Sequence, residues 1–203
     1  MFGSAIKRHA DAGETAAIRT RFPAGWITAQ VSAEFGDDAT LAALAAGLDK
    51  LQRDTGLGLV LFCAGRAPWH DDPAILHRLR LRLRAPGDCL VATSTHLLDL
   101  CALLANGRLC LASSLHARIV AEAFARPAAS LAQASTQGDK LRAYLETWHA
   151  DALHLHELEA PGQITAASAA LAEPARARAA RAARLAGLAA ATLQCCFDAL
   201  ARH

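Results

Sequence analysis

Short apolar runs alternate with amphipathic helical segments along most of the chain, and this alternation constrains the fold more than any other feature. Runs of strand length are predicted at residues 25–32, 57–65, 88–93, 108–112, 127–133 and 151–156. Helices are predicted between them at residues 37–56, 71–84, 94–107, 113–126 and 138–150. Strands and helices that alternate over short connections form βαβ units. The sequence therefore predicts an α/β fold, a Rossmann-like parallel sheet with helices on both faces.

The two ends of the chain differ in composition from this α/β region and set the predicted domain boundaries. Residues 1–22 are polar and mixed, which indicates a lead-in helix or a linker remnant. The Rossmann-like domain is expected at residues 23–160. Residues 161–203 are rich in Ala and Arg, which favours a C-terminal helical extension that packs on the domain. Pro174 should divide this extension into two helices.

Three arginines of the extension, Arg178, Arg181 and Arg184, recur every three residues. They would line one face of a helix, where they could form a patch for phosphate groups or for a membrane surface. A solvated helix face opposite a Leu and Ala core face explains the same spacing, and we prefer that interpretation.

Composition narrows the function classes. No apolar run reaches the roughly 18 residues that a bilayer crossing requires, and the first residues lack the apolar centre of a secretory signal. A net charge of +2 and an aromatic content of 5% indicate no nucleic-acid partner. The six cysteines form no Cys-x-x-Cys pair, which argues against structural zinc and a disulfide framework. We expect a cytoplasmic protein, with peripheral attachment to the inner membrane as an alternative.

Polar side chains follow each predicted strand, at the edge where open parallel sheets bind their ligands. The glycine-rich dinucleotide fingerprint is absent after the first strand, where the sequence is VSAEFGDD. The candidates in chain order are Ser32, Glu34, Arg66, His70, Asp71, Asp72, Thr93, Ser94, Thr95, His96, Ser113, Ser114, His116, Gln133, Ser135 and Lys140.

His116 is the candidate with the most specific chemistry, because it follows the fourth strand at the first turn of a predicted helix. Ser113 or Ser114 would cap that helix, and its first N–H groups would form an anion site. Three apolar residues share the helix face of His116: Ile119, Val120 and Ala123. We therefore place it at the cleft end of an inward face, where an imidazole can exchange protons with a hydroxyl. Its position alone leaves open a structural role, in which the ring bonds a neighbouring loop.

Other candidates have a structural interpretation beside the functional one. The His70–Asp72 segment has metal-ligand side chains, but Asp71 or Asp72 as the helix cap before Pro73 is the interpretation we prefer. For His96, the two interpretations are a place in the cleft and a place on a solvated first turn of a helix. For Arg66, they are binding of a carboxylate or phosphate and a place on a surface loop. His149, His154 and His156 are close in sequence, and His154 and His156 would share one face of a strand. No cysteine or other third ligand has a convincing spacing to that pair, so we expect no metal site there.

The segment GRLCLASSLHARIVAEAFARPAASLAQAS, preceded by LVATSTHLLDLCALLANG, resembles the C-terminal half of the polysaccharide pyruvyl transferase family. The family has a strand that ends in a Ser-Arg-Leu-His-Gly-like motif, followed by an apolar helix, a proline turn and a lysine. The matching residues are Ser113, Leu115, His116, Pro127 and Lys140. The resemblance covers roughly residues 25–155. Ser114 stands where the family has an arginine, and the first strand is not followed by the arginine often found there.

The resemblance implies one Rossmann-like half of a GT-B-like fold. It implies an enzyme that transfers pyruvate from phosphoenolpyruvate to a sugar of a surface polysaccharide or its lipid-linked precursor, forms a cyclic ketal and releases phosphate. His116 would be the acid/base, and no cofactor is expected. The implied substrate-binding residues are Ser113, Ser114, Leu115, Arg66, Thr93, His96 and Lys140.

The family's N-terminal half has no counterpart in these residues. The chain is therefore part of a larger protein, pairs with a partner chain or a second copy that completes the cleft, or is a shortened relative with altered activity. The alternative is a non-catalytic or accessory Rossmann-like module in exopolysaccharide biosynthesis, or half of a split glycosyltransferase. Ser114 favours that alternative, because a serine cannot make the bidentate contact of an arginine with a carboxylate or phosphate.

Overall fold

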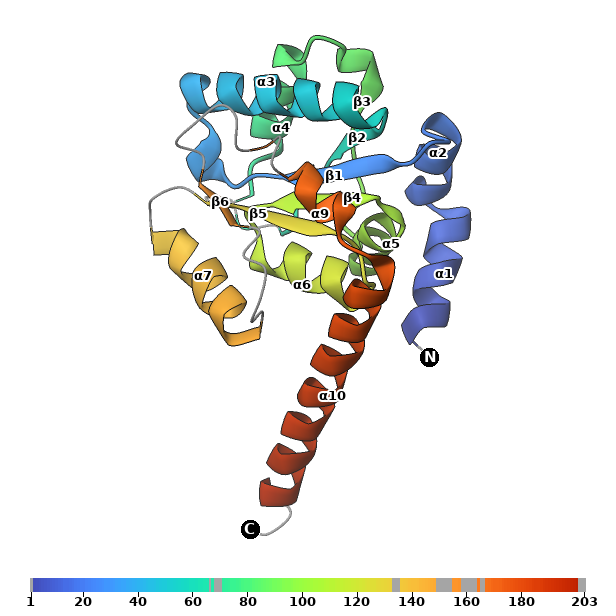
Figure 1. The fold of residues 1–203 in the computed structure, drawn as a ribbon. Helices are drawn as coiled ribbons and strands as arrows, with labels where there is room; N and C mark the ends of the chain where they lie inside the picture. Colours follow the sequence, from blue (N-terminus) through green and yellow to red (C-terminus); the bar gives the residue numbers. More distant parts are fainter. Residues whose placement is uncertain are drawn as a thin grey trace.

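The computed structural model describes residues 2–65, 67, 71–132, 136–148, 155–157, 164 and 167–200. In this part of the chain, a parallel sheet has the strand order β3-β2-β1-β4-β5-β6 (Figure 1). The strands are β1 (Trp26–Gln30), β2 (Gly58–Leu61), β3 (Cys89–Val91), β4 (Leu109–Ala112), β5 (Ala128–Ala132) and β6 (Leu155–Glu157). The predicted Rossmann-like parallel sheet is confirmed.

Helices cover both faces of the sheet. The first face packs against α3 (Asp38–Thr55), α4 (Pro73–Arg82) and α9 (Ser168–Ala172). The second face packs against α5 (Leu97–Asn106), α6 (Leu115–Ala123) and α2 (Glu14–Arg21), with α1 (Phe2–Ala12) outside α5. The remaining elements are η1 (Ala33–Phe35), η2 (Pro86–Asp88), α7 (Thr136–Trp148) and α10 (Ala175–Leu200).

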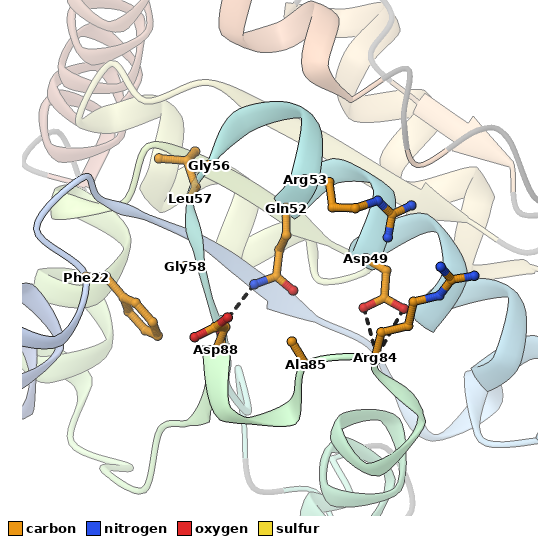
Figure 2. A pocket seen from close by; sticks show the side chains of 10 residues that line it. All are labelled: Phe22, Asp49, Gln52, Arg53, Gly56, Leu57, Gly58, Arg84, Ala85 and Asp88. Carbon is orange, nitrogen blue, oxygen red and sulfur yellow. Dashed lines mark hydrogen bonds between the residues drawn. The ribbon is translucent and has the colours of Figure 1, made fainter.

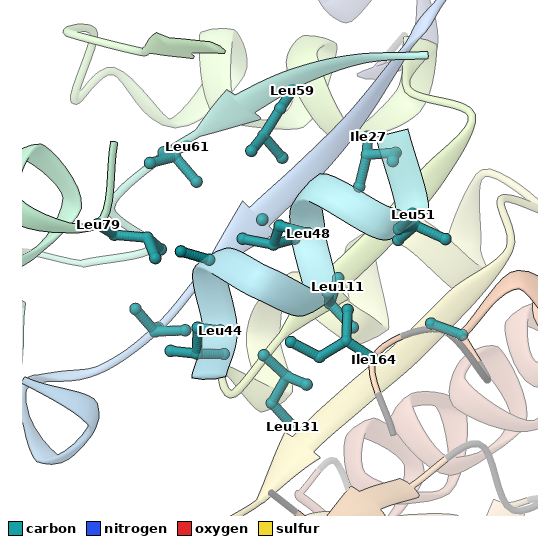
Figure 3. Close-up of a cluster of buried hydrophobic side chains, with 14 of the residues drawn as sticks. Ile27, Leu44, Leu48, Leu51, Leu59, Leu61, Leu79, Leu111, Leu131 and Ile164 are labelled. Atoms are coloured by element: carbon teal, nitrogen blue, oxygen red, sulfur yellow. The ribbon is translucent and has the colours of Figure 1, made fainter. Parts of the chain in front are cut away.

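The core of the first face follows from the apolar spacing of α3 (Figure 3). The leucines that recur at helical spacing along α3 are buried: Leu41, Leu44, Leu48 and Leu51. They pack against residues of the strands, among them Ile27 and Leu59, which are also fully buried. Ile164 enters the same cluster beside Gly47, where an added Cβ would lie 2.8 Å from the Cβ of Ile164. The absence of a side chain at Gly47 therefore lets the C-terminal segment close over α3.

The N-terminal residues pack on the second face. Ile6 and Ala10 of α1 are buried against α5, in a cluster with Cys101, Ala102 and Ala105. Ile18 of α2 is buried in the larger cluster that contains Trp26 and Val60. Both helices thus contribute apolar side chains to the body of the protein. This packing fixes α1 along α5, and it brings His9, near the end of α1, to Asp99 in the first turn of α5.

The C-terminal extension is divided as predicted, because α9 ends before Pro174 and α10 begins directly after it. Arg178 donates to the carbonyl oxygens of Glu173 and Ala125, and Arg181 pairs with the Glu173 carboxylate at 2.5 Å. Arg184 donates to the carbonyl oxygen of Trp148. The preferred interpretation, a solvated helix face, is therefore wrong for Arg178 and Arg181. Their side chains bond to acceptors at the start of α10 and on the body of the protein, and the spacing of the arginines in the sequence does not reveal those acceptors.

Beyond these arginines, α10 extends away from the body of the protein (Figure 1). Its side chains at residues 186–192 are exposed. Among the described helices, none combines the length and the apolar character that a bilayer crossing requires.

Candidate functional site

The carboxyl ends of β1 and β4 form the point where the strand order of the sheet reverses. The chain leaves β1 toward β2 and β3 on one side, and it returns to β4 and β5 on the other. Connecting segments diverge at such a point and leave a crevice, where open α/β sheets bind ligands. The end of β1 contributes Gln30 and Ser32 to this edge, and the end of β4 contributes Ser113 and Ser114.

These polar residues bond first to one another. The hydroxyl of Ser113 accepts the N–H of Ser32 at 3.1 Å and lies 3.3 Å from Oε1 of Gln30. The same Oε1 accepts the N–H of Ser114 at 2.9 Å. Gln30, Ser32 and Ser113 are all buried, so their hydrogen bonds satisfy polar groups that water does not reach. Ser113, predicted to bind substrate, thus ties β4 to β1 in this structure.

Ser114 is the N-cap of α6, which confirms one of the two predicted caps. Its hydroxyl accepts the N–H of Ala117 at 3.3 Å. Gln30 already bonds the N–H of Ser114, so two of the terminal donors are satisfied by the protein itself. The N–H groups of Leu115 and His116 have no hydrogen bond within the described part of the chain. The anion site that the sequence predicts is therefore reduced to these two donors.

The orientation of α6 differs from the prediction. His116 is exposed, as are Ile119 and Ala123 on the same face. The buried face consists of Ala117, Arg118, Ala121 and Glu122. The prediction that His116 lies on the inward face was wrong, because alanines occur on both faces and the inward face carries two opposite charges that neutralise each other. His116 keeps its place at the carboxyl edge, accessible to a ligand.

Arg118 and Glu122 form a buried ion pair, with Nε of Arg118 2.8 Å from Oε1 of Glu122. Arg118 also donates to the hydroxyl of Ser130 at 3.0 Å, and Tyr144 donates to Oε2 of Glu122 at 2.8 Å. Burial, and then the charge of Glu122, raises the pKa of the Tyr144 phenol. Because Arg118 is 2% exposed, it does not replace the arginine expected near His116.

Of the other predicted site residues, Thr93 and His96 bond to residues outside β1, β4 and α6. Thr93 donates its N–H and its hydroxyl to Oε1 of Glu14, at 2.8 and 3.0 Å. His96 is exposed and caps α5, with its Nδ1 accepting the N–H of Leu98 at 3.3 Å. Leu115 is half-buried at the start of α6, and Lys140 is exposed on α7.

Two more predictions concern the segment after β2. Asp72 caps α4 by accepting the N–H of Ala74 at 2.8 Å, as the preferred interpretation expected. Arg66 and His70 lie outside the described residues, as do Gln133, Ser135, His149 and His154.

A cavity of about 540 Å³ opens at the opposite edge of the sheet, where β2 begins (Figure 2). Phe22, Gln52, Arg53 and Arg84 are among its lining residues. The carboxylate of Asp49 accepts the backbone N–H of Arg84 at 3.1 and 3.2 Å. This edge lacks the helix N-termini that follow parallel strands at the carboxyl edge. We therefore centre the candidate site on β1, β4 and α6.

Sequence reasoning missed a group formed by His9, His96 and Asp99. One ligand atom from each residue lies within 4.8 Å of the others, an arrangement that could hold a metal ion. His9 and Asp99 are 90 positions apart, and the packing of α1 on α5 brings them together. No local spacing in the sequence signals this group.

No protein-family model matches the sequence, and a comparison with curated proteins also finds no match. Solved structures are similar in fold. The α,α-trehalose 6-phosphate synthase of Burkholderia multivorans has a TM-score of 0.60 and 14% identity, over 93% of this chain and 44% of that one. The UDP-GlcNAc 2-epimerase of Methanocaldococcus jannaschii, in complex with UDP-GlcNAc and UDP, has a TM-score of 0.58 and 12% identity, over 85% and 45%.

The ADP-heptose lipopolysaccharide heptosyltransferase II of E. coli has a TM-score of 0.54 and 18% identity, over 83% of this chain and 51% of that one. This chain thus spans about half the length of the structures that it matches. At sequence identities this low, the similarity establishes the fold and no more. The chain has the Rossmann-like fold of one half of a GT-B protein.

Proposed function

We propose that this chain is one half of a GT-B-type transferase that acts on a sugar and binds its phosphorylated donor at the β1/β4 edge. One observation carries the proposal: the two N–H groups of Leu115 and His116 stand beside an exposed imidazole at the switch point of the sheet. N–H groups at a helix N-terminus favour an anion, and an imidazole can move protons to and from hydroxyls. The other wall of the cleft would come from a partner chain, from a second copy or from a further part of a longer protein.

The donor that we propose is phosphoenolpyruvate, as the resemblance to the pyruvyl transferases implies. A sugar hydroxyl would add to the enol carbon that bears the phosphate, while the terminal carbon takes up a proton. A second hydroxyl would then displace phosphate and close the ketal. His116 would accept protons from the hydroxyls and supply the proton to carbon. Its exposure supports this role, since both substrates must reach the ring.

A second candidate is an accessory module without catalysis, or half of a glycosyltransferase that takes a nucleotide sugar. Two observations favour the accessory module. The charge of Arg118 is neutralised in the interior, and Gln30 and Ser114 already accept two of the N–H groups at the start of α6. The hypothesis of a glycosyltransferase half is supported by the fold, which is similar to that of proteins named for UDP-GlcNAc and ADP-heptose.

The test is ligand binding and turnover by the full chain. We expect phosphoenolpyruvate to raise the melting temperature, and phosphate to be released once galactosyl or mannosyl acceptors are added. His116→Ala should abolish release, while His77→Ala, an exposed histidine on α4, should leave it unchanged. A shift with UDP-sugars alone would select the glycosyltransferase half. Unchanged melting with every donor at millimolar concentration would select the accessory module.

A further inference from the structure

Three metal-ligating side chains meet where α1 packs against the N-terminal turn of α5. Nδ1 of His9 lies 2.6 Å from Oδ1 of Asp99. The rings of His9 and His96 are stacked, with centroids 4.8 Å apart and an angle of 6° between their planes. The side chains of His9 and Asp99 are 33% and 22% exposed, and His96 is exposed, so a small cation can reach all three.

Neighbouring groups orient the carboxylate of Asp99. Ser94 donates its hydroxyl to Oδ2 of Asp99 at 2.5 Å, on the oxygen that His9 does not contact. Ser94 is held in turn, because its backbone N–H donates to Oε2 of Glu14 at 3.1 Å. Such outer contacts fix ligand orientation in metal sites.

The backbone between α1 and α2 also leaves room for this group. An added Cβ at Gly13 would lie 2.9 Å from the carbonyl oxygen of His9 and 3.3 Å from Oδ1 of Asp99. Glycine thus permits the close approach of the α1–α2 junction to Asp99. Since Ile6 and Ala10 anchor α1 on α5, His9 is held at this position by packing as well as by its hydrogen bond.

We propose that His9, His96 and Asp99 bind a divalent transition-metal ion such as Zn²⁺, which joins α1 to α5. Imidazole nitrogens and a carboxylate oxygen are ligands that Zn²⁺ takes, and three protein ligands leave one tetrahedral position for water. Bond lengths of about 2.0–2.2 Å put the ligand atoms of such a site roughly 3.3 Å apart. The His9–Asp99 pair therefore opens slightly on binding. The exposed ring of His96 turns out of its stack on His9, because the lone pair of an imidazole nitrogen lies in the plane of the ring.

Coordination through Nδ1 of His9 requires this nitrogen to give up the proton that it donates to Asp99, either to Nε2 of the same ring or to solvent. The alternative is a clasp made only by the hydrogen bonds among His9, Asp99 and Ser94, with no affinity for a metal. The site lies at the end of β3, apart from the α6 terminus, and the proposal does not depend on the proposed function.

Zn²⁺ titration of the metal-stripped full chain, followed by calorimetry, tests the proposal. We expect one ion per chain and a higher melting temperature with Zn²⁺. Asp99→Asn and His96→Asn should each weaken binding at least tenfold, and Ser94→Ala about tenfold, as for outer-shell partners. Asn is also a good helix cap, so His96→Asn keeps the start of α5. His77→Ala should bind as the wild type does.

Co²⁺ gives a second measurement, because its visible spectrum reports the coordination geometry. We expect a tetrahedral spectrum that disappears in His96→Asn, and circular dichroism checks that each variant folds. Binding of Zn²⁺ to Asp99→Asn and His96→Asn with wild-type affinity would overturn the proposal, since the ion would then occupy other ligands such as the Cys63 thiol. Absence of binding to the wild-type chain would leave the hydrogen-bonded clasp as the role of the group.

Discussion

Helix α6 carries polar side chains on two opposite faces, and their surroundings differ completely. The inner face buries the Arg118–Glu122 pair, which has 2% exposure at each side chain and further bonds to Ser130 and Tyr144. The outer face presents His116 to solvent beside Ile119, which is 40% exposed. The charged residues therefore contribute to stability, whereas ligand contact is what we propose for the histidine.

Removal of one charge from the inner face should have the largest effect. Arg118→Ala or Glu122→Ala leaves an uncompensated charge in the interior, which costs about 3–5 kcal/mol of unfolding free energy. Urea unfolding of the purified chain measures it. The double variant Arg118→Met, Glu122→Leu is the matched control and should recover most of the loss, because no unpaired charge remains. A loss below about 1 kcal/mol in both single variants would mean that the pair is hydrated in solution.

Removal of the Tyr144 hydroxyl should have a smaller effect on the same cluster. Tyr144→Phe removes a hydrogen bond to a charged acceptor and keeps the ring, so we expect a loss of about 1.5–3 kcal/mol. A double-mutant cycle with Glu122→Gln measures the coupling between the two residues. Additive effects of the two substitutions would show that the hydroxyl and the carboxylate do not interact.

The ionisation of Tyr144 gives a pH-dependent form of the same test. Burial, and then the charge of Glu122, raises the pKa of Tyr144 above the ordinary value of 10.0, so the folded state disfavours the phenolate. The stability contributed by this group is complete below pH 10 and is lost as the pH rises above it. Tyr144 is the single tyrosine of the chain, and the three tryptophans do not ionise, so the change in ultraviolet absorbance on phenolate formation reports Tyr144 alone. A reversible phenolate signal near pH 10 in the folded protein would contradict the burial of the hydroxyl.

Local chemistry made much of the fold predictable from the sequence. Apolar runs of strand length predicted the buried strands, and leucines at helical spacing predicted the core face of α3. The caps Asp72 and Ser114 were predictable because each depends on residues within three positions. The Pro174 break is equally local.

The candidate site was less predictable, because its contacts are distant in sequence. The bond of Gln30 to the N–H of Ser114 spans 84 positions, and the His9–Asp99 contact spans 90. The inner face of α6 was assigned wrongly because Arg118 and Glu122 enter the core as a neutral pair, which a count of apolar positions treats as two solvated charges. Helical periodicity therefore fails to identify the buried face of a helix when that face contains a neutralised ion pair.

The outer face should show the smallest effect on stability and the largest effect on ligands. His116→Ala removes an exposed side chain with no bond to the described residues, so we expect unfolding free energy to change by less than about 0.5 kcal/mol. Ligand-induced melting shifts should nevertheless become smaller, because the substitution removes the imidazole beside the N–H groups that we propose to bind the donor. Ile119→Ala, one turn along the same face, is the matched control and should keep those shifts. A large loss of stability in His116→Ala with unchanged shifts would reverse the division between the two faces of α6.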